Sequence, residues 1–198
     1  MTKYIIGAVV AGMLTGHFFL PNAFIDMTND LMVVGLCILL FFVGVDLGTE
    51  GTVVANMKRV GARILVFPLA TILGTFAGVI IASFFLNISV IESLIIGSGF
   101  GWYSLSPLII APYSIEISAI SFLHNVSREL IGIILIPIVA AKIGYVECTS
   151  LPGAAAMDTS LPIIEKATNG DIVVYSFLSG LSLSVLVPIL IPFFISLV

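Results

Sequence analysis

Apolar residues fill the chain in long runs, and the interruptions between these runs divide it into predicted elements. A membrane-spanning helix needs ~20 mostly apolar residues, and runs of about that length lie at 4–20, 31–47, 61–86, 118–141 and 171–198. Two further apolar segments, 91–111 and 149–165, are interrupted by glycine, proline and serine. The pattern predicts an all-α polytopic membrane protein with about five transmembrane helices and two broken helical segments.

Composition supports this fold class. The 198 residues are 60% hydrophobic and 9% charged, and the mean hydropathy of +1.26 lies far outside the range of soluble domains. The first run follows Lys3 as a signal peptide would, but it lacks a clear cleavage site, so we expect a retained helix. Cys37 lies inside a span and Cys148 in a loop, so we expect packing roles for them and no disulfide.

The basic residues indicate how the chain is oriented, because lysine and arginine in short loops stay in the cytoplasm. Lys3 precedes the first run, and the basic residues within 58–63 separate the second run from the third. If 91–111 dips in from outside and returns, the next span brings Lys142 to the cytoplasm, whereas a full crossing would leave it outside. The charges therefore favour re-entrant hairpins, a cytoplasmic N-terminus and an external C-terminus, with full crossings as the alternative.

The second half of the chain repeats itself at an offset of 55 residues. The sequence SFLHNVSRELIGIILIP at 121–137 aligns without a gap with SFLSGLSLSVLVPILIP at 176–192. At the same offset Pro107 aligns with Pro162. This similarity favours an internal duplication, and the alternative is biased composition.

The repeat predicts a division of the chain into units. Each repeat, 91–144 or 146–198, would consist of one broken hairpin followed by one long helix. Because such a unit crosses the membrane once, the second copy would be inverted, as in many secondary transporters. Residues 1–90 would form a separate three-helix unit of scaffold type, and residues 91–198 would form the transport unit.

The broken segments contain residues that let a helix stop inside a membrane. Irregular backbone at membrane depth is tolerated only where protein shields it or where it lines a watery cavity. Two tips entering from opposite faces would meet near the midplane, where transporters bind their substrates; ordinary kinked helices packed through small residues are the alternative. The expected breakers are Gly99, Gly101, Pro107, Pro152, Gly153 and Pro162.

Ionisable residues inside the span 118–141 suggest a function, because each costs at least ~2.5–3.5 kcal/mol on insertion scales. Neighbouring residues of a helix point about 100° apart, so we do not expect Arg128 to neutralise Glu129. An acid near a hairpin tip could exchange a proton for a cation, and a structural pair between Arg128 and a carboxylate is the alternative. The candidate substrate-binding and proton-binding residues are Glu129, Asp158, Asn125, Arg128, Trp102, Tyr103, Ser104 and Thr159.

Four motifs, GSGFGWYSLS, NVSRELIGIILIP, AAAMDTSLPIIE and LSVLVPILIPFF, occur in the order in which they occur in the lysine exporter (LysO) family of prokaryotic inner-membrane proteins, and the chain resembles that family. The resemblance implies export of L-lysine and its analogue thialysine by proton exchange. It places the family's acids on Glu129 and Asp158. Pro107 stands where the family usually has glycine, and His124 with Asn125 replaces a common Asn-Asp pair, so substrate or coupling could differ.

The resemblance also bears on partners. Full-length family members have an additional N-terminal unit of about three helices, and this chain begins after it. A small three-helix membrane protein, or a second copy of the chain, would then complete the assembly in the lipid bilayer. No cofactor, metal or nucleic acid is expected; proton coupling is expected, with sodium coupling as the alternative.

The leading hypothesis is therefore an antiporter of the inner membrane, with no enzymatic activity. An intramembrane aspartyl protease using Asp46 and Asp158 would need two close carboxylates, and the usual sequence signatures around them are missing. A cation-coupled transporter or channel for another small amino acid or organic solute is the alternative function.

Overall fold

A computed structural model describes residues 66–198, together with single helical positions at 11, 15, 34, 38, 41 and 45. The chain divides into two compact units, Met1–Asp46 and Leu47–Val198. The predicted spans 4–20 and 31–47 and the candidate Asp46 lie outside the described residues, apart from those single positions. The predicted division near residue 90 stays a prediction, and the fold is described below for the second unit only.

Three helices in residues 66–198 are long and apolar enough to cross a membrane. They are α4 (Val66–Leu86), α7 (Ile115–Lys142) and α9 (Gly170–Ile195). The shorter elements between them are α5 (Val90–Gly97), α6 (Ser106–Ile110), the 3₁₀ helices η3 (Glu147–Ser150) and η4 (Gly153–Met157), and α8 (Leu161–Ala167). These elements contain no strand, so within 66–198 the predicted all-α membrane fold is confirmed.

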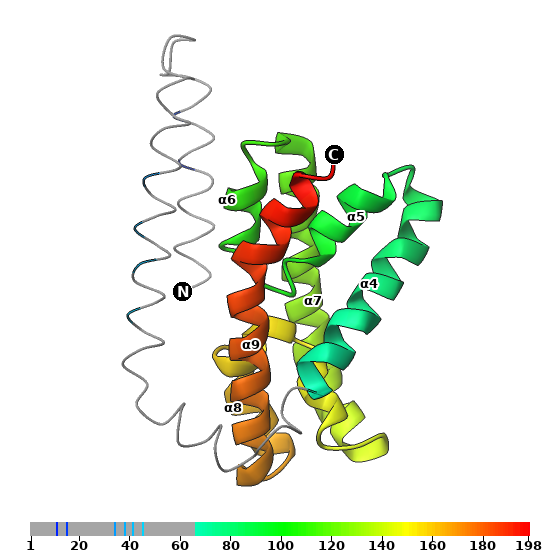
Figure 1. Ribbon diagram of the computed structural model, residues 1–198. Helices are drawn as coiled ribbons and strands as arrows, with labels where there is room; N and C mark the ends of the chain where they lie inside the picture. Colours follow the sequence, from blue (N-terminus) through cyan, green and yellow to red (C-terminus); the bar gives the residue numbers. More distant parts are fainter. Residues whose placement is uncertain are drawn as a thin grey trace. The chain divides into compact units, whose positions relative to one another are not determined.

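Each short group of elements turns back on itself, as Figure 1 shows. We call residues 90–110 hairpin 1: α5 starts near the end of α4 and runs inward, and α6 returns to the same end of the bundle. We call residues 149–167 hairpin 2: it rises from the opposite end, and α8 returns there. The long helices α7 and α9, which follow the two hairpins, run in opposite directions.

Local sequence explains where hairpin 1 begins and breaks. Ser89 and Glu92 form a capping box at the start of α5, each side chain accepting a hydrogen bond from the other residue's main-chain N–H at 3.1 Å. The helix ends before Gly101, whose φ of +94° is open to glycine but strained for other residues. Pro107 then lies in the first turn of α6, where its missing N–H is not needed.

Hairpin 2 uses the same residue types. Pro152 is followed by Gly153, whose φ is +68°. The chain then forms η4 and a turn, and Pro162 lies in the first turn of α8. The two proline-started helices, α6 and α8, are therefore the returning limbs of their hairpins.

The tips of the two hairpins touch through their main chains. The N–H of Ala154 donates a hydrogen bond to the carbonyl oxygen of Phe100 at 2.8 Å. No room remains for side chains at this contact, because a Cβ at Gly101 would lie 2.5 Å from the oxygen of Pro152 and a Cβ at Gly153 would clash with the oxygen of Phe100. Phe100 is completely buried, so the tips form part of the core.

A serine on each long helix binds the hairpin that precedes it. The hydroxyl of Ser121 on α7 lies 2.8 Å from the hydroxyl of Ser106 in hairpin 1. The hydroxyl of Ser176 on α9 donates to the oxygen of Ala156 in hairpin 2 at 2.7 Å. Ser121 and Ser176 are both completely buried and are 55 residues apart, whereas their partners Ser106 and Ala156 are 50 residues apart. The duplication stays a prediction.

Candidate functional site

Two acids and a threonine come together where hairpin 2 meets α7. Glu129 on α7 is 8% exposed, and its Oε1 accepts a hydrogen bond from the Thr159 hydroxyl at 2.6 Å. The same hydroxyl lies 3.3 Å from Oδ1 of Asp158. Asp158 ends η4, and its carboxylate also accepts the N–H of Thr159. We call these three residues the carboxylate site.

The carboxylate site has one hydroxyl hydrogen for two acids. A threonine hydroxyl carries a single hydrogen and can donate to only one carboxylate at a time. The second acid, Asp158, accepts the main-chain N–H of Thr159 at the same oxygen that faces the hydroxyl. Two ionised carboxylates sharing one site also repel each other, which favours uptake of a proton or another cation. The geometry therefore suits a site that holds either a proton or a cationic group.

The turn of hairpin 1 lies within electrostatic reach of the same acids. The phenol of Tyr103 is close enough to Glu129 and Asp158 for their charges to act on it, and its ring packs edge-on against Phe122 with centroids 6.4 Å apart. Trp102 is half-buried and Ser104 is exposed in the same turn. Asp158 and Thr159 are exposed as well, so the carboxylate site is open on one side.

Asn125 holds hairpin 1 in place. This completely buried residue accepts the N–H of Gly101 at its Oδ1, at 2.7 Å. Its Nδ2 lies within hydrogen-bonding distance of the Ser106 hydroxyl and of the hydroxyl and carbonyl oxygens of Ser121, at 2.9, 3.1 and 2.8 Å. A Cβ at Gly99 would clash with the same amide. Both polar atoms of Asn125 are thus engaged by protein, so positioning is the role that its contacts support.

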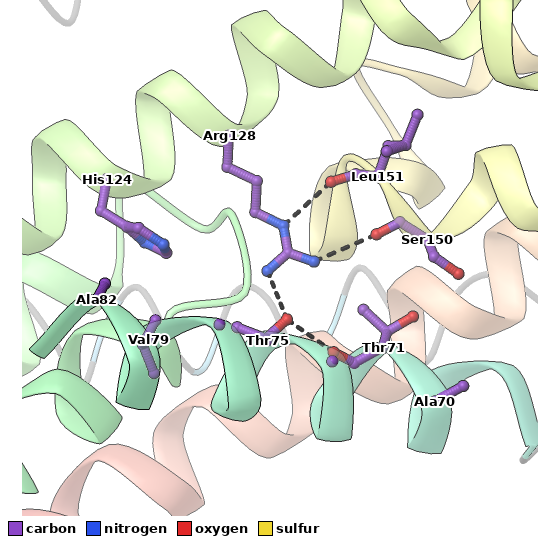
Figure 2. Close-up of a pocket in the computed structure, with 11 residues that line it drawn as sticks. Ala70, Thr71, Thr75, Val79, Ala82, His124, Arg128, Ser150 and Leu151 are labelled. Atoms are coloured by element: carbon purple, nitrogen blue, oxygen red, sulfur yellow. Dashed lines mark hydrogen bonds between the residues drawn. The ribbon is translucent and has the colours of Figure 1, made fainter. Parts of the chain in front are cut away.

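Arg128 extends away from the carboxylate site, toward α4. Its Nε donates to the oxygen of Leu151 at 3.1 Å, one terminal nitrogen to the oxygen of Ser150 at 3.2 Å, and the other to the hydroxyl of Thr75 at 2.9 Å. Figure 2 shows these three bonds. Within residues 66–198 the partners of Arg128 are neutral oxygens rather than the carboxylate of a structural ion pair. The reason is local, because η3 ends here and leaves main-chain carbonyl oxygens without helical donors.

A cavity of about 520 Å³ lies beside Arg128, and we call it the Arg128 cavity (Figure 2). A smaller cavity of about 250 Å³ adjoins it at Val79, Ala82 and His124. The Arg128 cavity is lined by Ala70, Thr71, Gly74, Thr75, Gly78, Val79, Ala82, His124, Arg128, Ser150 and Leu151.

The sequence pattern did not single out Thr75, nor Ser121 and Ser176, although all three hold site elements in place. A signal was available for the serines, because they align in the repeat. Thr75 lies between Gly74 and Gly78 in a span that is otherwise apolar, and that pattern alone does not distinguish a polar contact from helix packing. Residues 66–198 contain no group of three histidine, cysteine, aspartate or glutamate side chains that could hold a metal ion.

Comparisons with known proteins identify a family that this chain matches. The family model described as lysine exporter LysO matches residues 6–195. The lysine exporter LysO of Escherichia coli (strain K12) is 32% identical over 189 residues, which cover 95% of this chain. A proposed lysine exporter of Haemophilus influenzae (strain ATCC 51907 / DSM 11121 / KW20 / Rd) is 28% identical over 193 residues, which cover 97% of each chain.

The chain spans 62% of the length of the E. coli relative. No solved structure matches this chain. The family match extends over almost every residue and includes both hairpins and both acids of the carboxylate site. The chain therefore belongs to the lysine exporter LysO family.

Proposed function

We propose that the protein is a secondary active transporter that exports L-lysine, and its analogue thialysine, from the cytoplasm in exchange for protons. The observation that carries the proposal is the Thr159 hydroxyl between Glu129 and Asp158. Lysine carries two ammonium groups, and a protonated carboxyl and a carboxylate with bound ammonium are alternative states of such a site. The relatives' names support lysine as the solute.

The position of the carboxylate site suggests how binding is coupled to movement. Glu129 belongs to α7, whereas Asp158 and Thr159 belong to hairpin 2. A displacement of hairpin 2 relative to α7 would therefore open the site or bring the two acids together. Such movement of one element against another around a central site is the usual basis of alternating access. The protein would not need to break any helix in order to change state.

The aromatic residues of hairpin 1 would complete the solute site. Tyr103 lies within electrostatic reach of both acids, and the face of a tyrosine or tryptophan ring attracts an ammonium group. Trp102 and Tyr103 would contact the ammonium or the aliphatic stem of lysine. Ser104, which is exposed beside them, would offer a hydroxyl to a polar end of the solute.

For location and assembly, we propose the inner membrane, with the N-terminus in the cytoplasm and the C-terminus outside. The proposed partner is a small three-helix membrane protein or a second copy of the chain. The greater length of the E. coli relative supports an additional unit of this kind. Copurification of the full chain from its native membrane, followed by mass measurement of the intact complex, tests the assembly.

The transport proposal is tested in proteoliposomes. Lysine counterflow and lysine-driven proton movement should both occur with the wild type. Glu129→Gln and Asp158→Asn should each abolish the proton movement, because neither amide can exchange a proton at neutral pH. Lysine counterflow should also fall, because each variant removes a negative charge from the carboxylate site. Unchanged transport in both variants would contradict the proposed roles, and Thr159→Ser, which keeps the hydroxyl, is the matched control.

A further inference from the structure

The Arg128 cavity is separate from the carboxylate site. Glu129, Asp158 and Thr159 do not line it, although Arg128 is the neighbour of Glu129 on α7. Its volume of about 520 Å³ lies within the range of about 300–1,000 Å³ that is typical of small-molecule pockets. The cavity therefore has room for part of a solute, and its lining determines which chemical group would bind there.

The strongest feature of that lining is an incompletely bonded cation. A guanidinium group has five N–H donors, and three hydrogen bonds are formed with Leu151, Ser150 and Thr75. Two donors are left, one on each terminal nitrogen. All three partners are uncharged oxygens, so within residues 66–198 no anion balances the charge of Arg128. A cation inside a membrane is costly without such a partner, and a carboxylate would supply both a negative charge and acceptor oxygens for the remaining donors.

A second polar group in the lining also lacks a partner. Nδ1 of His124 is buried without a hydrogen bond to any described residue. His124 lies one helical turn before Arg128 on α7, and both side chains line the cavity (Figure 2). That nitrogen has almost no accessible surface, so it faces protein rather than the cavity. Arg128 is therefore the side chain that offers donors to this space.

The opposite wall of the Arg128 cavity is formed by α4, whose side chains do not fill the cavity. It consists of small residues, among them Gly74 and Gly78, at which an added Cβ would meet nothing within 4 Å. Small residues at such spacing also occur where transmembrane helices pack together. Helix packing alone would not explain the unused N–H donors of Arg128, however. We therefore interpret this space as a site for an anionic group rather than as a surface for helix packing.

We propose that the Arg128 cavity is a carboxylate-binding subsite, and that its ligand is the α-carboxylate of the transported amino acid. The inference rests on the proposed function only in taking an amino acid as the solute. The solute would then meet two neighbouring residues of α7 at successive positions along its path, its ammonium group at Glu129 and its carboxylate at Arg128. The same amine without a carboxylate would lose only the second interaction.

The test compares L-lysine with cadaverine, which is lysine without its carboxylate, by calorimetric titration of the full protein in nanodiscs. The wild type should bind lysine more tightly than cadaverine. Arg128→Gln should weaken lysine binding roughly 10- to 100-fold, the range for a lost hydrogen bond to a charged group, and leave cadaverine affinity unchanged. Loss of the preference for lysine supports the subsite, and a preference that persists in Arg128→Gln overturns it.

Arg128→Gln also removes hydrogen bonds to hairpin 2, so a second variant is needed that blocks the cavity and keeps those bonds. Gly78→Leu places a side chain in open space and touches none of the hydrogen bonds of Arg128. It should reduce the preference for lysine over cadaverine, whereas Ala77→Leu, next to it on α4 but outside the cavity lining, should not. Equal behaviour of the two variants would overturn the proposal.

The pair of ligands also separates the two proposals. If the wild type binds neither lysine nor cadaverine, lysine is the wrong solute, and the same comparison is repeated with arginine and agmatine, then with ornithine and putrescine. A preference for the amino acid that disappears in Arg128→Gln supports the carboxylate subsite for that solute. No preference in any pair overturns it.

Discussion

Ala154 and Phe100, which are 54 positions apart in the chain, are joined by a main-chain hydrogen bond of 2.8 Å between the tips of the two hairpins. Both residues are buried. The contact satisfies an N–H and a carbonyl group that lipid could not satisfy. It also links hairpin 2, which contributes Asp158 and Thr159, to hairpin 1, which contributes Tyr103. The position of Tyr103 relative to the carboxylate site therefore depends on this contact between backbones.

Gly101→Ala tests how closely the tips approach. The added Cβ would lie 2.5 Å from the oxygen of Pro152, and φ at this position is +94°. We expect a loss of stability of about 1–3 kcal/mol from clash and backbone strain, measured by thermal unfolding in detergent. Gly74→Ala is the control, since its Cβ would meet nothing within 4 Å. Equal effects of the two substitutions would contradict the tip contact.

Asn125→Leu tests the role of the buried amide. It removes the acceptor of the Gly101 N–H and leaves that donor without a partner, and it removes the amide that donates to the hydroxyls of Ser106 and Ser121, which keep only the bond to each other. Each buried polar group left unsatisfied costs ~1–3 kcal/mol, so we expect strong destabilisation in thermal unfolding.

Asn125→Asp is the informative comparison. It keeps the acceptor for Gly101 and lets Ser106 and Ser121 reorient their hydroxyls as donors, although it cannot donate to the main-chain oxygen of Ser121. We expect a smaller loss of stability than in Asn125→Leu. If the leucine variant were as stable as wild type, Asn125 would not be holding hairpin 1.

The order of long and broken segments could be predicted because each depends on local composition. The apolar runs 118–141 and 171–198 correspond to α7 and α9, and the broken segments 91–111 and 149–165 correspond to the hairpins within a few residues. Glycine at a positive φ and proline in the first turn of a helix are local preferences, so Gly101 and Pro107 were recognisable as breakers. The paths of the hairpins required the additional argument from Lys142 and the repeat.

Contacts between distant elements could not be predicted in the same way. The approach of Thr159 to Glu129 depends on how deep hairpin 2 reaches along α7, which local sequence does not encode. A carboxylate partner for Arg128 is only the alternative that the sequence suggests, and the carbonyl oxygens that Arg128 binds carry no side-chain signature. Thr75 comes from a different helix, and its contact with Arg128 depends on how α4 packs.

Ser176→Ala and Ser121→Ala test the equivalence of the two hairpin-plus-helix units. Each removes a buried hydroxyl that binds the preceding hairpin, and each should cost about 1 kcal/mol or more. Ser121→Ala should cost more, because Asn125 also donates to that hydroxyl. Ser182→Ala is the control, since its hydroxyl bonds only within α9, to Leu178. The stability of the three variants is measured by urea or thermal unfolding in detergent. A Ser176→Ala variant as stable as the wild type would argue against equivalent contacts.

Cys148 and an engineered Ser104→Cys should react very differently with a water-soluble maleimide. Cys148 is completely buried, and burial, together with the nearby Glu147, raises the pKa of its thiol to about 11. The thiolate is the reactive form, so at pH 8 only roughly one Cys148 in a thousand is ionised, and the reactive fraction rises as pH approaches 11. Ser104 is exposed in the turn of hairpin 1. In membrane vesicles, with Cys37→Ser as background, we therefore expect rapid labelling at 104 and very slow labelling at 148, read by the gel shift of a polyethylene-glycol maleimide. Slow labelling at 104 would mean that lipid or protein, rather than water, faces the turn of hairpin 1.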